Sequence, residues 1–151
     1  QTTLSIDDTQ KIVQKLQQRF PNIKAPKKED ICYATTNRQL AVKQMADCCE
    51  ALLVLGAPNS SNTMRLVECG LDAGIKKAQR IQTYKELDLE WLKDVHTLGI
   101  TAGASAPEIL VQDLLNYLNQ HFKVTQQEVV AAEENIQFKM PKSLAGLSTA
   151  Q

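Results

Sequence analysis

Two loops of this sequence carry the side chains best suited to binding an anion. The first, Asn59-Ser60-Ser61-Asn62, follows an apolar run and precedes a helical stretch. Its hydroxyl and amide groups, together with the free backbone N–H groups of a helix N-terminus, would suit an oxyanion such as phosphate. A plain helix cap with turn residues is the alternative interpretation, and for a single loop it is the more common one.

The second loop, from Thr101 to Pro107, has the same design. Its small residues let the backbone approach a ligand closely, and we expect Ser105 to be the N-cap of the helix that follows. Neither loop contains the Gly-Lys-Ser/Thr of a P-loop, and residues 99–103 do not match the dinucleotide-binding fingerprint. Two such loops in neighbouring units therefore favour an anion site without indicating a nucleotide.

A thiol, Cys32, precedes the helix expected at residues 38–49. A helix N-terminus favours the thiolate form and hence ligation of a metal or an iron–sulfur cluster. A single cysteine is more often an inert packing residue, and this alternative stays open. No Cys-x-x-Cys occurs in the chain, and neither His96 nor His121 has metal-site spacing to Cys32.

The elements that must position these loops alternate between strand and helix, which is typical of an α/β fold with a largely parallel sheet. We expect strands at 30–33, 51–56, 78–84, 95–100 and 136–140, and helices at 6–19, 38–49, 63–73, 87–93 and 107–122. Ser5 should cap the first helix, and Gly74 should end the third. Because the carboxyl ends of parallel strands share one edge, all three loops should face one crevice.

Three regions follow from this pattern. We expect residues 1–28 to be the end of a preceding α/β module plus a linker, because prolines and lysines gather between 21 and 29. Residues 29–122 would form the α/β module with the cysteine and the anion loops, and residues 123–151 a C-terminal tail.

Composition excludes several function classes. Seventeen basic and seventeen acidic residues give a net charge of zero, so no overall field attracts nucleic acid or an anionic membrane. No apolar run approaches the roughly 18 residues of a membrane span. We interpret Cys48, Cys49 and Cys69 as packing residues and expect reduced thiols, which favours the cytosol. The start at Gln1 shows no signal-peptide pattern, and we expect it to lie within a longer protein.

Three segments in register resemble the 4-hydroxy-3-methylbut-2-enyl diphosphate reductase family, the iron–sulfur enzymes that end the non-mevalonate isoprenoid pathway. They are Asp30-Ile31-Cys32-Tyr33-Ala34-Thr35-Thr36-Asn37-Arg38-Gln39, Asn59-Ser60-Ser61-Asn62-Thr63 with Arg65-Leu66, and Gly99-Ile100-Thr101-Ala102-Gly103-Ala104-Ser105-Ala106-Pro107. The opening Gln1-Thr2-Thr3-Leu4-Ser5 and the late Glu133-Glu134-Asn135-Ile136 are also similar to family segments. The resemblance covers nearly the whole chain but only about the C-terminal half of a family member.

The resemblance implies a fold of three α/β modules in a trefoil-like arrangement around a central [4Fe–4S] cluster that three cysteines hold. Cys32 would be the third of these ligands. The other two cysteines, the diphosphate-binding histidines and the proton-delivering glutamate of the family have no counterpart in this chain.

Further roles follow from the same resemblance. Ser60, Ser61, Asn62 and Ser105 would bind the diphosphate. Thr2 would lie near the substrate hydroxyl and contribute to both binding and catalysis. Thr35 would line the cavity beside the cysteine as a second catalytic residue.

The implied activity is that of a cytoplasmic oxidoreductase. It would reductively remove the hydroxyl group of its diphosphate substrate to give isopentenyl and dimethylallyl diphosphates, with electrons from ferredoxin or flavodoxin. The missing N-terminal half of the same protein would be a required partner, and this chain alone would be inactive. A non-catalytic phosphate- or diphosphate-binding α/β module, and a structural fragment that associates through its exposed face, are the alternatives.

Overall fold

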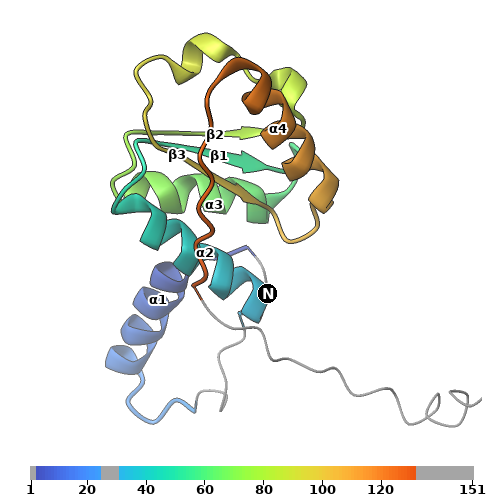
Figure 1. Cartoon of the computed structure of the whole chain (residues 1–151). Coiled ribbons are helices and arrows are strands. Elements are labelled where there is room, and N and C mark those ends of the chain that lie inside the picture. The colour runs from blue at the N-terminus through green and yellow to red at the C-terminus, as the bar shows by residue number, and fades with distance from the viewer. Residues whose placement is uncertain (1–2, 25–30, 132–151) are drawn as a thin grey trace, which may run out of the picture.

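The described part of the chain forms a three-stranded parallel sheet covered by helices on both faces (Figure 1). The structure is a computed structural model that describes residues 3–24 and 31–131. The strands β1 (Ala51–Leu55), β2 (Lys77–Ile81) and β3 (Leu98–Ala102) lie in the order β2-β1-β3. The expected α/β class with a parallel sheet is confirmed.

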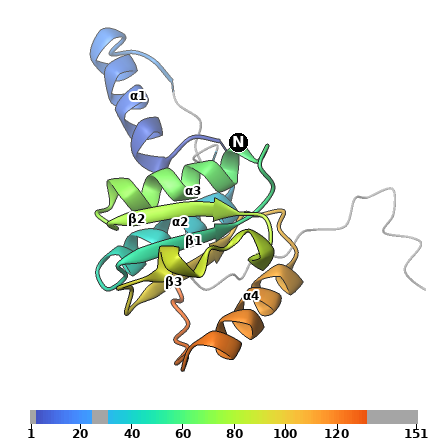
Figure 2. The same ribbon diagram turned by 90° about the horizontal axis from the view of Figure 1, so that it is seen from above.

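Within residues 3–24 and 31–131, four α-helices and two short 3₁₀ helices surround this sheet. They are α1 (Ile6–Arg19), α2 (Tyr33–Ala46), α3 (Ser61–Asp72) and α4 (Glu108–His121), with η1 (Tyr84–Glu86) and η2 (Leu89–Leu92) between β2 and β3. Helices α2 and α3 cover one face of the sheet, and α4 with the 3₁₀ segment covers the other (Figure 2). No helix among the described residues is long and apolar enough to cross a membrane.

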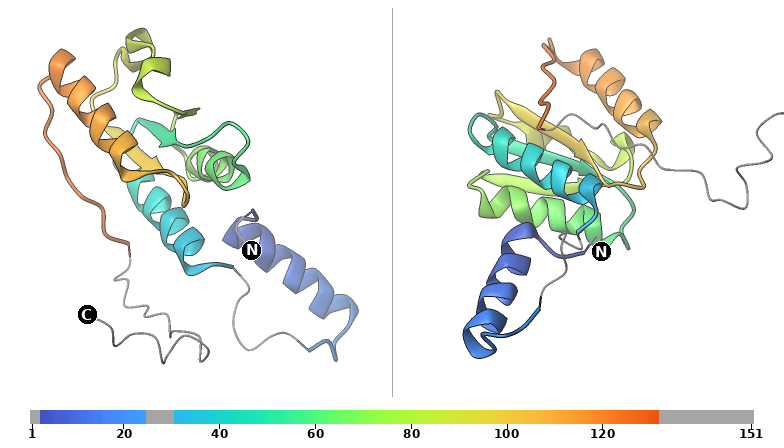
Figure 3. Two further views of the ribbon diagram at one scale, coloured as in Figure 1. Left: turned by 90° about the vertical axis from the view of Figure 1, so that its right-hand side faces the viewer. Right: turned by 90° about the horizontal axis from the view of Figure 1, so that it is seen from below.

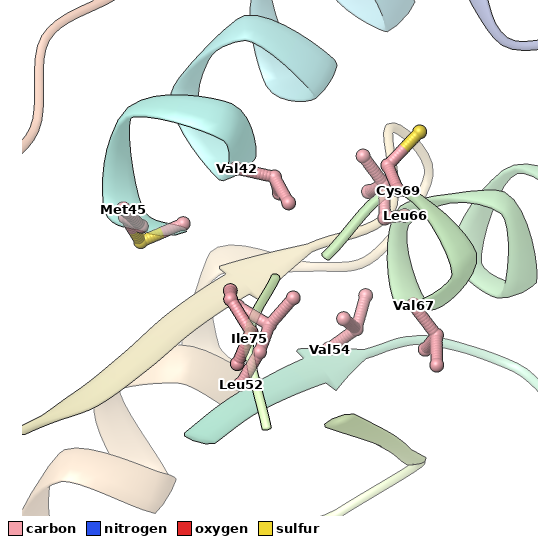
Figure 4. Packing of buried hydrophobic residues seen from close by; sticks show 8 residues of the cluster. All are labelled: Val42, Met45, Leu52, Val54, Leu66, Val67, Cys69 and Ile75. Carbon is pink, nitrogen blue, oxygen red and sulfur yellow. The ribbon is translucent and has the colours of Figure 1, made fainter. Parts of the chain in front are cut away.

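The central strand β1 is buried along its whole length, because it has a neighbour on each side and helices on both faces. On one face it packs into an apolar cluster shared with α2 and α3 (Figure 4). The members of that cluster are Val42, Met45, Leu52, Val54, Leu66, Val67, Cys69 and Ile75. Leu53 and Leu55 point into the second cluster, which includes Leu114 and Leu118 of α4.

Residues 123–131 come after α4 in the chain and run along the β3 side of the sheet (Figure 2). They lead from the cluster under α4 to the cluster under α2 and α3. Val124 packs against the cluster under α4, and Val129 packs against the cluster under α2 and α3. This part of the expected tail therefore contributes to the core. The expected strand at 136–140 lies outside the described residues.

Helix α1 extends away from the rest of the molecule (Figure 3). It begins as predicted, because Ser5 Oγ accepts a hydrogen bond from the amide of Asp8 at 3.0 Å. None of its residues is buried, and its apolar side chains face solvent, with Ile12 49%, Leu16 41% and Phe20 51% exposed.

The second helix differs from the prediction at both ends. It runs from Tyr33 to Ala46 instead of over 38–49, and the described part of the expected strand at 30–33 is not a strand. The carbonyl of Cys32 accepts hydrogen bonds from the amides of Thr35 and Thr36, so the helix already begins beside the thiol. The sequence hides this start because the cap is a cysteine whose side chain makes no capping bond.

Other boundaries shift by a few residues. The strand expected at 95–100 begins only at Leu98, and His96 lies in the loop before it. The strand expected over 78–84 ends at Ile81, where the chain turns into η1, and the helix expected at 87–93 is the 3₁₀ helix η2. Helix α3 begins at Ser61, two residues earlier than predicted, and Gly74 follows it with a positive φ of 103°.

Glu50 holds the loop before β3 against the start of β1. Its carboxylate accepts hydrogen bonds from the amides of His96 at 2.6 Å and Thr97 at 3.3 Å. These bonds, the His96 one first, hold the pKa of Glu50 below its ordinary value of 4.5. A lowered folded-state pKa adds stability above the unfolded pKa, and that stability is lost as the pH falls through the folded value.

We therefore expect Glu50→Gln to destabilise the chain near neutral pH, with the difference from wild type shrinking as the pH falls below the unfolded-state pKa of Glu50 and vanishing below its folded-state pKa. Urea unfolding at a series of pH values measures this. Glu128→Gln, at an exposed site, is the control and should show no such trend. If the stability difference between Glu50→Gln and wild type stays constant with pH, the carboxylate of Glu50 does not stabilise the fold through its lowered pKa.

The exposed apolar stripe of α1 predicts that the isolated chain self-associates. Leu16→Lys combined with Phe20→Lys should lower the apparent mass in light scattering. The matched control is Gln14→Lys with Gln18→Lys, which adds the same charge to the opposite face of the helix. If both double variants behave alike, the stripe is not the cause of association.

Candidate functional site

The parallel register brings the ends of β1 and β3 to one edge of the sheet. Leu55 pairs with Ala102, so the loops that follow the two strands begin side by side. The amide of Gly103 donates to the carbonyl of Leu55 at 2.8 Å, which carries the contact beyond the last strand residue. The two predicted anion loops are therefore neighbours in space.

The side chain of Thr63, in α3, packs against both loops. A side chain at Gly56 or at Gly103 would collide with that of Thr63, which is only 1% exposed. Its hydroxyl donates to Ser60 Oγ at 2.8 Å, and Ser60 Oγ in turn caps α3 by accepting from the amide of Thr63. Sequence reasoning assigned no role to Thr63, although a threonine three residues after an N-cap serine was a signal for it.

The two loops line one open pocket of about 350 Å³, a size in the range of small-molecule sites. Its walls are formed by Thr3, Ser60, Ser61, Asn62, Ala104 and Ser105. The structure thus brings together the four residues that were predicted to bind diphosphate. Thr2 lies outside the described residues, and its neighbour Thr3, which the prediction left without a role, lines the pocket.

The pocket wall is polar and lies at the start of α3. Ser61 and Ser105 are exposed to solvent, whereas Asn62 is buried. The first turn of α3 adds backbone N–H groups that have no acceptor within the helix. Ser105 was expected to be the N-cap of the next helix, and this prediction is wrong. The N-cap is Pro107, whose fixed φ suits a helix start, and α4 begins at Glu108.

A second pocket, of about 470 Å³, adjoins the first and shares Thr3, Ser60 and Ser61 with it. Arg65 and Glu68 of α3 line this second space. Arg65 also pairs with Asp8 at the start of α1. The hydrogen bonding of Ser5 and then the charge of Arg65 hold the pKa of Asp8 below its ordinary value.

Arg38 joins the start of α2 to the same edge of the sheet. Its Nε donates to the carbonyl of Ala102 at 3.2 Å, and its Nη1 donates to that of Ala34 at 3.0 Å. Cys32, the N-cap of α2, is half-buried and does not line either pocket. Two of the three predicted loops therefore share the pocket, and the third lies on the helix that Arg38 ties to β3.

Thr35, one turn after Cys32, is fully buried. Its hydroxyl is the one buried side-chain oxygen or nitrogen in the described part of the chain that makes no hydrogen bond. A buried hydroxyl without a partner is costly, so it fits a site whose lining is completed by further groups.

Cys32 could supply one ligand of a metal cluster, but the described residues do not provide a complete set of ligands. Within the described ranges no three His, Cys, Asp or Glu side chains are grouped so that they could hold a metal ion. Cys48 and Cys49 follow the opposite end of α2, and all four cysteines are free. Burial raises the pKa of Cys49 to about 11 and also raises that of Cys69, which keeps these two in the thiol form.

Comparison with known proteins finds one matching family model, "LytB protein", over residues 1–119. A 4-hydroxy-3-methylbut-2-enyl diphosphate reductase of Roseobacter denitrificans is 56% identical over 144 residues, which are 95% of this chain and 46% of the relative. A reductase of the same name from Phenylobacterium zucineum is 56% identical over 146 residues, which are 97% of this chain and 46% of the relative. The chain spans about half the length of these relatives.

Among solved structures, the E-1-hydroxy-2-methyl-but-2-enyl-4-diphosphate reductase of Plasmodium falciparum is similar with a TM-score of 0.87 and 38% identity. The match covers 97% of this chain and 46% of that one. The agreement in sequence extends over most of the described fold, including both anion loops and Cys32. The chain therefore belongs to the LytB protein family, as its three motifs had indicated.

Proposed function

We propose that this chain is the part of a 4-hydroxy-3-methylbut-2-enyl diphosphate reductase that binds the diphosphate group of the substrate and supplies one cluster thiolate. The complete protein would reductively remove the hydroxyl group and release isopentenyl and dimethylallyl diphosphates. The observation that carries the proposal is the pocket in which Ser60, Ser61, Asn62 and Ser105 meet. Family membership supports the same reaction, because the relatives carry the name of this reductase.

The pocket suits a diphosphate for electrostatic reasons. Hydroxyl and amide donors, together with the N-terminus of α3, offer a fixed set of positive dipoles to an anion. Hydrogen bonds to a charged acceptor are roughly twice as strong as those between neutral groups. The loops are held by the contacts of Gly56 and Gly103 with Thr63, so these donors need little rearrangement on binding.

Cys32 is the proposed ligand of the [4Fe–4S] cluster in this chain. When bound, the cluster would supply electrons and a Lewis-acidic iron for removal of the hydroxyl oxygen as water. Thr35 would line the cavity beside the thiol, and its buried hydroxyl without a hydrogen-bond partner supports that role. Thr2 would lie near the substrate hydroxyl.

The remaining ligands and acids belong to the part of the protein that the chain does not include. We assign residues 1–28 to the end of a preceding module, which agrees with the exposed apolar side of α1. Residues 29–122 would be the module around the pocket, in a trefoil-like arrangement of three. The protein would work in the cytoplasm and receive electrons from ferredoxin or flavodoxin.

A non-catalytic diphosphate-binding module is the second candidate, and one observation favours it. The pocket is lined without any contribution from Cys32, so anion binding does not depend on a cluster. The two candidates differ in the complete protein, since only the reductase consumes the substrate.

Calorimetry with inorganic diphosphate on the isolated chain tests the pocket. Ser61→Ala and Ser105→Ala should each weaken binding by about tenfold, because each removes a hydrogen bond to a charged group. Thr125→Ala, which removes an exposed hydroxyl elsewhere, is the control and should bind as wild type does. If both serine variants bind diphosphate with wild-type affinity, this pocket is not the diphosphate site.

Cys32→Ser in the complete protein tests the cluster thiolate. Iron and acid-labile sulfide per chain should fall sharply after anaerobic reconstitution, and reductase activity should be lost. Cys48→Ser, at the exposed thiol beyond α2, should change neither. Full iron content and turnover in Cys32→Ser would overturn the assignment.

A further inference from the structure

The segment from Thr3 to Ser5 leads from the pocket wall into α1 and belongs to no helix or strand. It runs past α2 and α3, and side chains from both helices bind its backbone and that of Ile6, the first residue of α1. Thr3, at the start of this segment, lines both pockets. The position of Thr3 in the site therefore depends on what holds these few residues.

Gln39 of α2 binds the segment in the manner of a neighbouring strand. Its Oε1 accepts a hydrogen bond from the amide of Ile6 at 2.9 Å, and its Nε2 donates to the carbonyl of Leu4 at 3.2 Å. The side chain is fully buried, with 0% exposure. A primary amide has both a donor and an acceptor, so one side chain can pair with two alternate backbone groups.

Arg65 of α3 binds the same segment one residue earlier. Its Nε donates to the carbonyl of Thr3 at 3.1 Å. Its Nη1 pairs with Glu68 on its own helix at 2.6 Å and with Asp8 of α1 at 3.3 Å. The two carboxylates orient the planar guanidinium, so the Nε donor is directed at the Thr3 carbonyl.

We propose that Gln39 and Arg65 are positioning residues that fix the backbone of Thr3 to Ile6 and thereby hold Thr3 on the wall of the diphosphate pocket. The identity of the ligand rests on the proposed function, whereas the positioning rests on these contacts alone. Packing of α1 contributes little to holding this segment, because no residue of α1 is fully buried.

The ion pair between Lys43 and Asp7 also joins α2 to the first turn of α1, at 2.8 Å. Both side chains are more than a third exposed, so this pair adds little. Lys43 binds Asp7, within the helix that follows the segment, which makes Lys43→Met the matched control for a general loosening of α1.

The first test follows amide hydrogen exchange in residues 3–9 of the complete protein. Gln39→Met keeps the length of the side chain but removes both hydrogen bonds, so the Ile6 amide should exchange about tenfold faster. Arg65→Met should speed amide exchange at the Thr3 end of the segment. The Arg65 side chain is partly exposed, so this variant should fold even if Gln39→Met does not. Exchange as slow as in Lys43→Met and wild type would overturn the positioning role.

The second test measures reductase kinetics of the same proteins. Gln39→Met and Arg65→Met should raise KM by about tenfold with a smaller change in kcat, because substrate binding must then order the segment. Lys43→Met should match wild type. An unchanged KM in both variants would overturn the proposal. A wild-type protein without reductase activity would instead refute the proposed function, and the exchange data would still decide the positioning.

Discussion

The parallel pairing of β1 with both of its neighbours is the constraint on which the rest of the structure depends. Every residue of Ala51–Leu55 is buried, so the strand has one register and two covered faces. That register puts the carboxyl ends of β1 and β3 together, and the glycines that follow both strands then meet Thr63. Because the glycines leave no room for adjustment, the loops after the strands are placed as precisely as the strands themselves.

The candidate functional groups of the chain lie in two separate places. The hydroxyl and amide groups of the pocket lie at the start of α3 and in the loop after β3, whereas the thiol of Cys32 precedes α2, which Arg38 ties to the end of β3. The hydroxyl and amide groups line one pocket together, whereas within the described residues no three His, Cys, Asp or Glu side chains are grouped so that they could hold a metal ion. This division agrees with the proposed function, in which the chain would supply the anion side of a site shared between modules.

Packing and polar contacts have separate tasks in this molecule. Apolar clusters on the two faces of the sheet hold the helices α2, α3 and α4. The first turn of α1 is held by hydrogen bonds and an ion pair to Gln39 and Arg65 instead, and the apolar side chains of the helix are left exposed. The hydrogen bonds and ion pairs named above between α1 and the helices α2 and α3 lie at its first turn, so they can hold the segment before the helix without covering its apolar side chains.

Local sequence by itself determined the α/β class, the helix over Ile6–Arg19 and the central strand, because capping at Ser5 and the run of apolar residues 51–55 are short-range signals. It also singled out Ser60, Ser61, Asn62 and Ser105 as candidate anion ligands, through their types and their match to a family, and these four residues do line one pocket. It did not reveal the start of α2, because a cysteine cap carries no recognisable side-chain signal. The start of β3 was missed since the amides of His96 and Thr97, just before it, bind the carboxylate of Glu50, which lies 46 and 47 residues earlier in the chain. Only the tertiary structure brought Thr3 and Arg65 to the pockets, Thr63 against both loops and Gln39 against the backbone of Leu4, because these contacts join segments that lie far apart in the chain.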